Sequence, residues 1–176
     1  MKNVKNYLNG KTVYLAGSIH HNNVDSGVDW REKLTPQLEN FGLNVIDPCK
    51  KTINEFSEIG QDKEHLKQLI KDGNFAQVRE IFFPILKSDL RCVDISHFII
   101  VNYIPKIRHV GTIHEIVMAN FEKKPILLYY PKEQLEEFNP WIACLIKEKH
   151  FFNDWNKMLE YLTNVDNGNF DTSLWY

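Results

Sequence analysis

The chain has 176 residues, and its 43% hydrophobic and 25% charged residues predict a single soluble domain with an ordinary apolar core. The 21 basic and 23 acidic residues leave a net charge of -2 without a long basic run, which argues against nucleic acid and anionic membranes as partners. No apolar run approaches the length of a membrane span, and the N-terminal stretch lacks the apolar centre of a signal peptide. The three cysteines are far apart and form no CxxC pair, which indicates reduced thiols in the cytoplasm and no thiolate zinc site.

The first part of the chain predicts a β-α-β unit. Thr12–Gly17 (TVYLAG) is a short apolar run that ends in glycine, as a buried strand would. Apolar residues at helical spacing then predict a helix over Val28–Phe41, which Gly42 is placed to end. A second short strand is expected at Leu43–Asp47, where Pro48 stops it.

The middle of the chain is predicted to be helical. We interpret the polar stretch at about 50–74 as an insertion in the single domain 1–176, with one helix over Asp62–Lys71 that Gly73 ends. Phe75–Ser96 also has a helical pattern. Pro84 lies within that pattern and is expected to kink the helix or to divide it in two, because proline removes a backbone donor.

The last part of the chain returns to alternating strands and helices. His97–Ile104 is apolar, β-branched and aromatic, which predicts the central strand of the sheet. A helix that begins at Thr112, a strand over Pro125–Tyr130 and helices at about 140–149 and 154–162 complete the domain. Such alternation is typical of a parallel sheet covered by helices on both faces.

Ligands of parallel sheets bind beyond the carboxyl ends of the strands, so the segments of interest are GSIHH, DPCK, NYIPKIRHVGTIHE and YYPKE. Three known motifs are excluded. The GKT at residues 10–12 lacks the earlier glycine of a phosphate loop and precedes a strand, and both GxGxxG and GxSxG are absent. The pair His20–His21 has no HExxH context, so contact with substrate or solvent is favoured over a metal site.

The segment VGTIHEIVMAN (Val110–Asn120) allows two interpretations of Glu115. In the first, Thr112 and Glu115 form a capping box at the start of a helix, and Glu115 is structural. The apolar stripe that would pack on the sheet then excludes Glu115 and consists of Ile113, Ile116, Val117 and Phe121. The local pattern alone favours this structural interpretation.

Three features favour the second interpretation, in which Glu115 is a catalytic carboxylate. The helix follows the central strand, so its N-terminus is expected at the ligand end of the sheet, where Gly111 allows close backbone approach. A helix N-terminus also favours an ionised carboxylate by roughly 0.3–1 kcal/mol. Asp89 is expected at the end of the preceding helix, and its side chain is able to reach the same edge of the sheet. Two carboxylates at one cleft suit glycosidic chemistry, in which one attacks the anomeric carbon and the other assists the leaving group.

Four stretches carry a resemblance to a known family: VYLAGSI, DL, SHFIIVNYIP and GTIHEIVMANFEKKPILLYYP. In this order and spacing, from Val13 to about Trp155, they resemble the nucleoside 2-deoxyribosyltransferase family, and most of all its phage and bacterial deoxyribosyltransferase-like branch. The resemblance implies a flavodoxin-like α/β fold, with a doubly wound parallel sheet in three α/β/α layers. It also implies a homo-oligomer, a small-molecule substrate (a deoxynucleoside or deoxynucleotide, with a free nucleobase) and no metal or other cofactor.

The implied reaction is cleavage of the N-glycosidic bond of a 2′-deoxynucleoside. A glutamate attacks C1′ to form a deoxyribosyl-enzyme, and another base then takes the sugar; relatives instead use water to hydrolyse 5′-monophosphates. By motif, Glu115 in GTIHE would be the nucleophile, and Asp89 in DL would protonate the leaving base. The substrate-binding residues expected from the motifs and the strand ends are Tyr14, Gly17, Ser18, His20, Asp47, His109, Gly111 and Thr112.

His109 departs from the family pattern, because the transferases carry an aspartate there, six residues before the nucleophile, that contacts the sugar hydroxyls. This departure keeps open a non-catalytic nucleotide-binding module of the same fold. Tyr176 matches the family's C-terminal tyrosine, which reaches an active site.

The interpretation of other residues stays open. Asp47 either contacts the pocket or makes the turn before Pro48. Arg31, with the two adjacent histidines, either faces a phosphate, as in a monophosphate hydrolase, or belongs to a solvated surface. Structural roles are expected for Trp30, Cys92, Asp94 and Trp141.

Overall fold

The computed structural model describes residues 6–19, 29–50, 63–169 and 175 of the chain. At its centre lies a five-stranded sheet in the order β2-β1-β3-β4-β5, in which every neighbouring pair is parallel. The strands are β1 (Thr12–Gly17), β2 (Asn44–Ile46), β3 (Phe98–Asn102), β4 (Ile126–Tyr129) and β5 (Phe151–Phe152). This strand order is that of the flavodoxin-like fold, so the fold class implied by the resemblance is confirmed.

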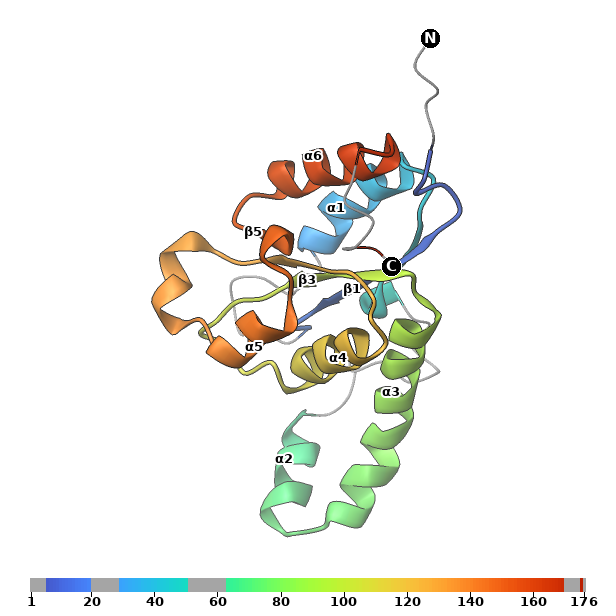
Figure 1. Ribbon diagram of the computed structural model, residues 1–176. Helices are drawn as coiled ribbons and strands as arrows, with labels where there is room; N and C mark the ends of the chain where they lie inside the picture. The colour runs from blue at the N-terminus through green and yellow to red at the C-terminus, as the bar shows by residue number, and fades with distance from the viewer. Residues whose placement is uncertain (1–5, 20–28, 51–62, 170–174, 176) are drawn as a thin grey trace.

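Helices cover both faces of the sheet and complete a three-layer α/β/α arrangement (Figure 1). One face is covered by α1 (Asp29–Glu39) and α6 (Trp155–Asp166). The other is covered by α3 (Phe75–Ile95), α4 (Val110–Phe121) and α5 (Pro140–Leu145).

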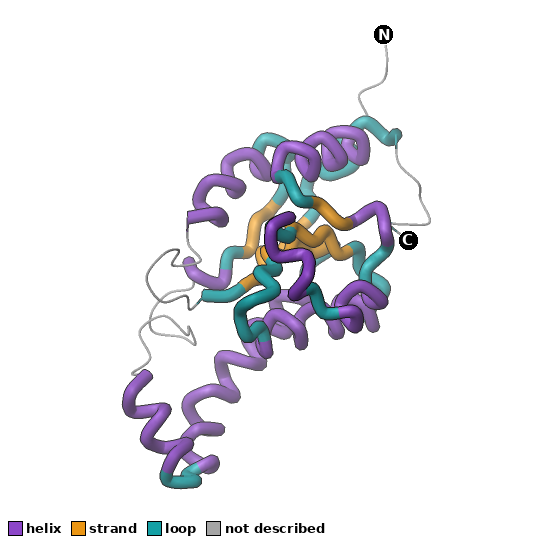
Figure 2. The backbone as a smooth tube through the Cα atoms, turned by 90° about the vertical axis from the view of Figure 1, so that its left-hand side faces the viewer, coloured by secondary structure: helices purple, strands orange, loops and turns teal. Residues whose placement is uncertain are grey.

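The helix α2 (Lys63–Lys71) packs against the far end of α3, and the two project together from the body of the protein (Figures 1 and 2). Short 3-10 turns lie at Pro48–Lys50, Lys132–Glu137 and Glu148–His150. Among the described helices, none combines the length and the apolar character that crossing a membrane requires.

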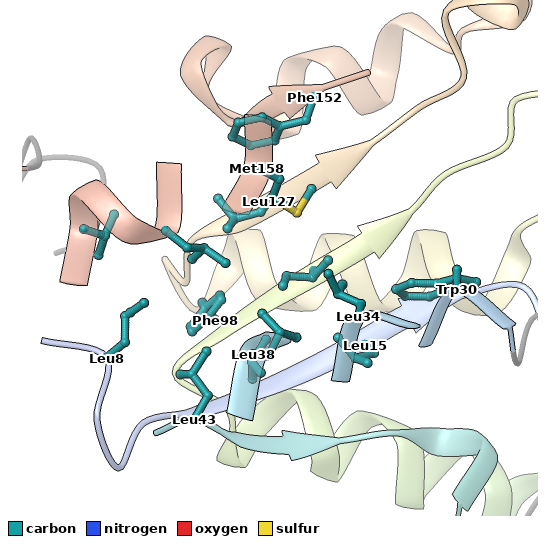
Figure 3. Close-up of a cluster of buried hydrophobic side chains, with 14 residues drawn as sticks. Leu8, Leu15, Trp30, Leu34, Leu38, Leu43, Phe98, Leu127, Phe152 and Met158 are labelled. Atoms are coloured by element: carbon teal, nitrogen blue, oxygen red, sulfur yellow. The ribbon is translucent and has the colours of Figure 1, made fainter. Parts of the chain in front are cut away.

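The central strands are buried on both sides, which explains why they are almost continuously apolar. In β1, Val13 and Leu15 point into the cluster under α1 and α6, shown in Figure 3 with Trp30 and other large side chains. Tyr14 and Ala16 point into the opposite cluster, under α3 and α4. Because successive side chains of a strand alternate between faces, Tyr14 is directed toward α4.

Most predicted elements are confirmed. The strand Thr12–Gly17 has the predicted bounds, and the other three predicted strands are each shorter by two or three residues. The periodicity of α1 also holds, because Trp30, Leu34 and Leu38 are buried in the core. Gly42 follows with a φ of +72°, a left-handed conformation that glycine adopts at low cost. The helix predicted at Asp62–Lys71 is present over Lys63–Lys71, and residues 51–62, Asp62 included, lie outside the described residues.

Two predicted features of the chain differ in the structure. Of the two options for Pro84, division of the helix is wrong, because α3 continues unbroken from Phe75 to Ile95. Proline removes one N–H bond, and packing against α2 and α4 holds the helix on either side. The helix predicted over 140–149 ends at Leu145, and the two-residue strand β5 follows. A strand so short has no periodicity of its own, and its parallel pairing with β4 defines it.

Candidate active site

The carboxyl ends of β1 and β3 open into a cavity of about 230 Å³. Its lining includes eight of the ten residues that the sequence predicted for the site: Tyr14, Gly17, Ser18, Asp89, His109, Gly111, Thr112 and Glu115. Ile19, Arg108 and Val110 complete it. Of the other predicted residues, His20 lies outside the described residues, as does Tyr176, and Asp47 lines a separate cavity. The edge where ligands of parallel sheets bind is therefore also where the predicted residues converge.

Another cavity of about 240 Å³ lies at the opposite end of β4. It is lined by three lysines and the buried His150, and its lining contains no carboxylate. Because glycosidic chemistry needs a carboxylate nucleophile, the cavity at the carboxyl edge is the better candidate for the active site.

A short side-chain hydrogen bond in the site joins Tyr14 to Glu115. The Tyr14 hydroxyl donates to Glu115 Oε1 over 2.6 Å, and the two side chains come from β1 and α4, far apart in the sequence. Both residues are buried, with 1% and 7% of their surfaces exposed. A donor at this distance is typical of a hydrogen bond to an ionised carboxylate. Tyr14 therefore compensates the burial of a charge that would otherwise be unfavourable.

The Tyr14 phenol remains a donor throughout the ordinary pH range. Burial, followed by the negative charges of Glu115 and Asp89, raises the pKa of Tyr14 well above its ordinary value. The effect of Asp89 also shows that its carboxylate, carried by α3, lies within electrostatic reach of the Tyr14–Glu115 pair. The site thus combines two carboxyl groups with a neutral hydroxyl.

The helix that carries Glu115 differs from the prediction. It begins at Val110, with His109 at the N-cap position and no side-chain capping bond, so Thr112 and Glu115 do not form a capping box. The predicted apolar stripe is only partly right: Ile116 is buried and Ile113 packs against the core, but the buried face also includes Thr112, Glu115 and Ala119. Val117 and Phe121, assigned to that stripe, are exposed. Glu115 therefore belongs to the buried face, where its bond to Tyr14 offsets the cost that a hydrophobicity pattern alone would assign to it.

The shifted start of α4 also changes the electrostatic argument for Glu115. The macrodipole acts mainly within the first turn of a helix. Glu115 lies in the second turn, so the stabilisation expected from the helix N-terminus is mostly lost at its position. The hydroxyl of Tyr14 donates a hydrogen bond to this carboxylate.

His109 organises the loop before α4. Its Nε2 lies 2.8 Å from the carbonyl oxygen of Ile104 and 3.2 Å from the amide nitrogen of the same residue. The ring is buried and packs against Tyr103, with 5.0 Å between centroids. His109 therefore lines the cavity and also ties the two ends of the loop together.

Arg31 is neither a phosphate contact nor a surface residue, so both predicted options are wrong. Its side chain is fully buried and donates to the carbonyl oxygens of Leu15, over 3.2 Å, and Gly17, over 2.8 Å. Because β2 pairs only with the first half of β1, these carbonyls face no neighbouring strand on that side, and the guanidinium satisfies them.

Asp47 contributes to the same buried arrangement as Arg31. Its carboxylate lies 3.6 Å from Arg31 and accepts from the amide of Cys49 over 2.9 Å. These contacts are those of a turn-making residue, in a cavity that Glu115 does not line.

Gly17 is located where backbones approach closely. A Cβ atom there would lie 3.1 Å from the carbonyl oxygen of Asn102 and 3.2 Å from the Trp30 side chain.

Trp30 itself is buried and stacks on Trp155 with 5.4 Å between centroids, which confirms its structural role. Trp141, by contrast, is 79% exposed, so its predicted role as a packing anchor is wrong.

Arg108, for which the motifs predict no role, lies in the cavity lining. A usable signal existed, because Arg108 lies in the segment between the central strand and the helix of Glu115, directly before His109. A single basic residue in a loop is common, however, and only the cavity distinguishes it from Lys106 in the same loop.

Fold and site together define a flavodoxin-like α/β protein that holds a tyrosine-bound carboxylate at its carboxyl edge. A solved 2-deoxyribosyltransferase from Bacillus psychrosaccharolyticus has this fold, with a TM-score of 0.59 and 19% identity over 85% of this chain and 91% of that one. A conserved protein from Enterococcus faecalis V583 gives a TM-score of 0.60 and 15% identity over 88% of this chain and 98% of that one. No protein-family profile and no curated protein matches the sequence. The chain therefore shares the fold of a 2-deoxyribosyltransferase, as its motifs predicted.

Proposed function

We propose that this protein cleaves the N-glycosidic bond of 2′-deoxynucleosides, with Glu115 as nucleophile, and transfers the deoxyribosyl group to another base. The observation that carries the proposal is the 2.6 Å bond from Tyr14 to Glu115 in a cavity that Asp89 also lines. The fold shared with a 2-deoxyribosyltransferase supports it.

In the first half of the proposed reaction, a Glu115 carboxylate oxygen attacks C1′ and forms a C–O bond as the C1′–N bond breaks. The leaving base takes a proton from Asp89, which is then a carboxylate. In the second half, an incoming base attacks C1′, displaces Glu115 and returns a proton to Asp89. Tyr14 orients the nucleophile through its hydrogen bond.

The chemistry of the sugar suits this small set of groups. A 2-deoxy sugar lacks the electron-withdrawing 2′-hydroxyl, so its oxocarbenium-like transition state is reached more easily than that of a ribonucleoside. One positioned carboxylate with modest acid assistance is then sufficient, and every step uses a side chain of the described cavity.

The test is a base-exchange assay followed by chromatography. The wild type is incubated with each 2′-deoxynucleoside, with and without a second free base, and compared with the Glu115→Gln variant. Glu160→Gln, an exposed change on α6, is the matched control. A new deoxynucleoside formed by the wild type and by the control, and not by Glu115→Gln, supports the proposal. Free base without exchange indicates a hydrolase, and full activity of Glu115→Gln refutes the nucleophile.

We also propose that the protein assembles as a homo-oligomer, as the resemblance implies. The outward face of α4 carries exposed apolar side chains at same-face spacing, Val110, Val117 and Phe121. Light scattering of the wild type and of Phe121→Asp tests this. A wild type that is monomeric at micromolar concentration refutes it.

A further inference from the structure

The side chain of Lys124 links the two helices that carry the carboxyl groups of the candidate active site. Its ammonium donates to the carbonyl oxygen of Val93 over 2.7 Å and also to that of Asp94, both in the last turn of α3. Lys124 itself follows α4, which ends at Phe121. One side chain therefore joins the C-terminus of α3 to the segment that leaves α4.

These contacts are more ordered than those of an ordinary surface lysine. Only 16% of the Lys124 side chain is exposed, and its ammonium also lies 2.7 Å from the carboxylate of Glu122. The last carbonyls of a helix have no partner within the helix, and water is able to satisfy them. Holding a long side chain there costs rotamer freedom that water would not cost. What the lysine adds over water is a fixed distance between α3 and the end of α4.

The end of α3 that Lys124 binds is one helical turn from Asp89. Asp89 precedes Val93 by four residues, which corresponds to about 6 Å along a helix axis. Ile85 and Val93, four residues to either side of Asp89, are both buried, so the face of α3 that carries Asp89 is the one that rests on the core. These two apolar residues determine the rotation of α3 about its axis, and Lys124 restrains its C-terminus.

Pro84 makes that restraint more important. It removes one backbone hydrogen bond from α3 directly before Ile85, so the turn that precedes the C-terminal half of the helix is weakened. Glu115, by contrast, is held on α4 by the hydroxyl of Tyr14. The spacing of the two carboxyl groups therefore depends on how the C-terminal half of α3 is placed against α4, and Lys124 spans these two elements.

We propose that Lys124 is a positioning residue for the general acid, because it holds α3 where Asp89 reaches the leaving base while Glu115 attacks C1′. This inference rests on the proposed function, which assigns the proton transfer to Asp89. Lys124 lines the cavity at the opposite end of β4, so it acts through α3 and touches no reacting atom. Proton transfer requires heavy atoms within about 2.6–3.2 Å, and a displacement of about 1 Å costs up to about 100-fold in rate.

The test uses two substrates that differ in their need for an acid. The base of 2′-deoxyguanosine leaves as an anion unless it is protonated. The base of 7-methyl-2′-deoxyguanosine is already a cation, so the electron pair of the breaking C1′–N bond neutralises it and no proton from Asp89 is needed. If the wild type accepts only pyrimidines, the pair is 2′-deoxyuridine and 5-nitro-2′-deoxyuridine, because the nitro group stabilises the departing anion.

The kcat and KM of both substrates are measured for the wild type, Lys124→Met, Lys124→Arg and the control Lys123→Met, an exposed change at the neighbouring position. Asp89→Asn calibrates the loss of the acid, which should lower kcat for the ordinary base by about 100- to 10,000-fold. We expect Lys124→Met to lower the ratio of ordinary to activated kcat by about 10- to 100-fold, with little change in KM. Lys124→Arg should recover part of the ratio, because a guanidinium is able to donate to the same carbonyls. Lys123→Met should keep the wild-type ratio.

The ratio separates positioning from stability, because both substrates meet the same fraction of folded protein. A Lys124→Met variant that keeps the wild-type ratio, or that loses both activities in proportion, overturns the proposal and leaves Lys124 a structural residue. If Lys124→Met does not fold, Lys124→Gln, which keeps a donor without the charge, is measured in the same way. A wild type that cleaves neither substrate refutes the proposed function, and the role of Lys124 with it, whereas a proportional loss in an active enzyme refutes the role of Lys124 alone.

Discussion

The two faces of β1 differ in composition and in what they do. Val13 and Leu15 point into a cluster of apolar side chains between the sheet, α1 and α6. Tyr14, on the other face, meets the buried carboxylate of Glu115 at 2.6 Å. A closely packed apolar face stabilises the fold, whereas a buried charge costs free energy unless a partner compensates it. One strand thus contributes to stability on one side and to the candidate chemistry on the other.

The largest expected effect comes from removing the charge of Glu115. We expect Glu115→Gln to lower turnover by at least about 1000-fold, as for the loss of other catalytic nucleophiles. Glutamine keeps an oxygen that accepts from Tyr14, so the circular dichroism spectrum and the thermal midpoint should change little. A variant that unfolds would indicate a structural role for Glu115.

A substitution on the other face should have the opposite result. Leu15 is fully buried in the α1 and α6 cluster, so Leu15→Ala should lower the free energy of unfolding by about 2–5 kcal/mol. Turnover per folded molecule should stay close to that of the wild type. Urea unfolding and an activity assay on the same samples measure both, and a selective loss of kcat would contradict the division between the faces.

The pH dependence of stability should depend on His150, which contacts Tyr161 of α6 at 2.9 Å. Burial, followed by the nearby Lys147, lowers the pKa of His150 to about 4, from an ordinary value of 6.5. The unfolded chain therefore takes up a proton below pH 6.5 that the folded protein takes up only below about 4. Stability is unaffected above pH 6.5 and falls as the pH decreases from 6.5 to 4, by about 3 kcal/mol.

The His150→Gln variant isolates this contribution. Glutamine has no titrating group, and its amide is able to replace the hydrogen bond to Tyr161. The difference in unfolding free energy between pH 7 and pH 4 should therefore be smaller in the variant than in the wild type. Equal differences would show that other groups control the acid sensitivity.

The smallest expected effect concerns the hydroxyl of Tyr14. Tyr14→Phe keeps the ring in its cluster and removes one hydrogen bond to a charged group, which contributes about 1.5–3 kcal/mol. If that energy orients Glu115 for attack, kcat should fall by about 10- to 100-fold. Steady-state kinetics of the purified variant measure this, and an unchanged kcat would mean that the bond is only structural.

The site was partly visible in the sequence. Motifs and strand ends identified eight described residues that the cavity unites, because the carboxyl ends of parallel strands share one edge. Arg31 was misjudged because its type suggests a phosphate or solvent, whereas its partners are carbonyls that a short β2 leaves uncovered. Arg108 was overlooked because a single basic residue in a loop is common, and only the cavity distinguishes it from Lys106.

The sequence by itself determined four of the five described strands and the parallel α/β class, because apolar runs and helical periods report which side chains must avoid water. It also placed Glu115 and Asp89 at one end of the sheet. Only the tertiary structure decided how α4 is rotated. A hydrophobicity pattern assigns a carboxylate to the surface, and Glu115 is buried because Tyr14, 101 positions away in the chain, donates to it. That contact depends on long-range packing of α4 on β1, which no local pattern encodes.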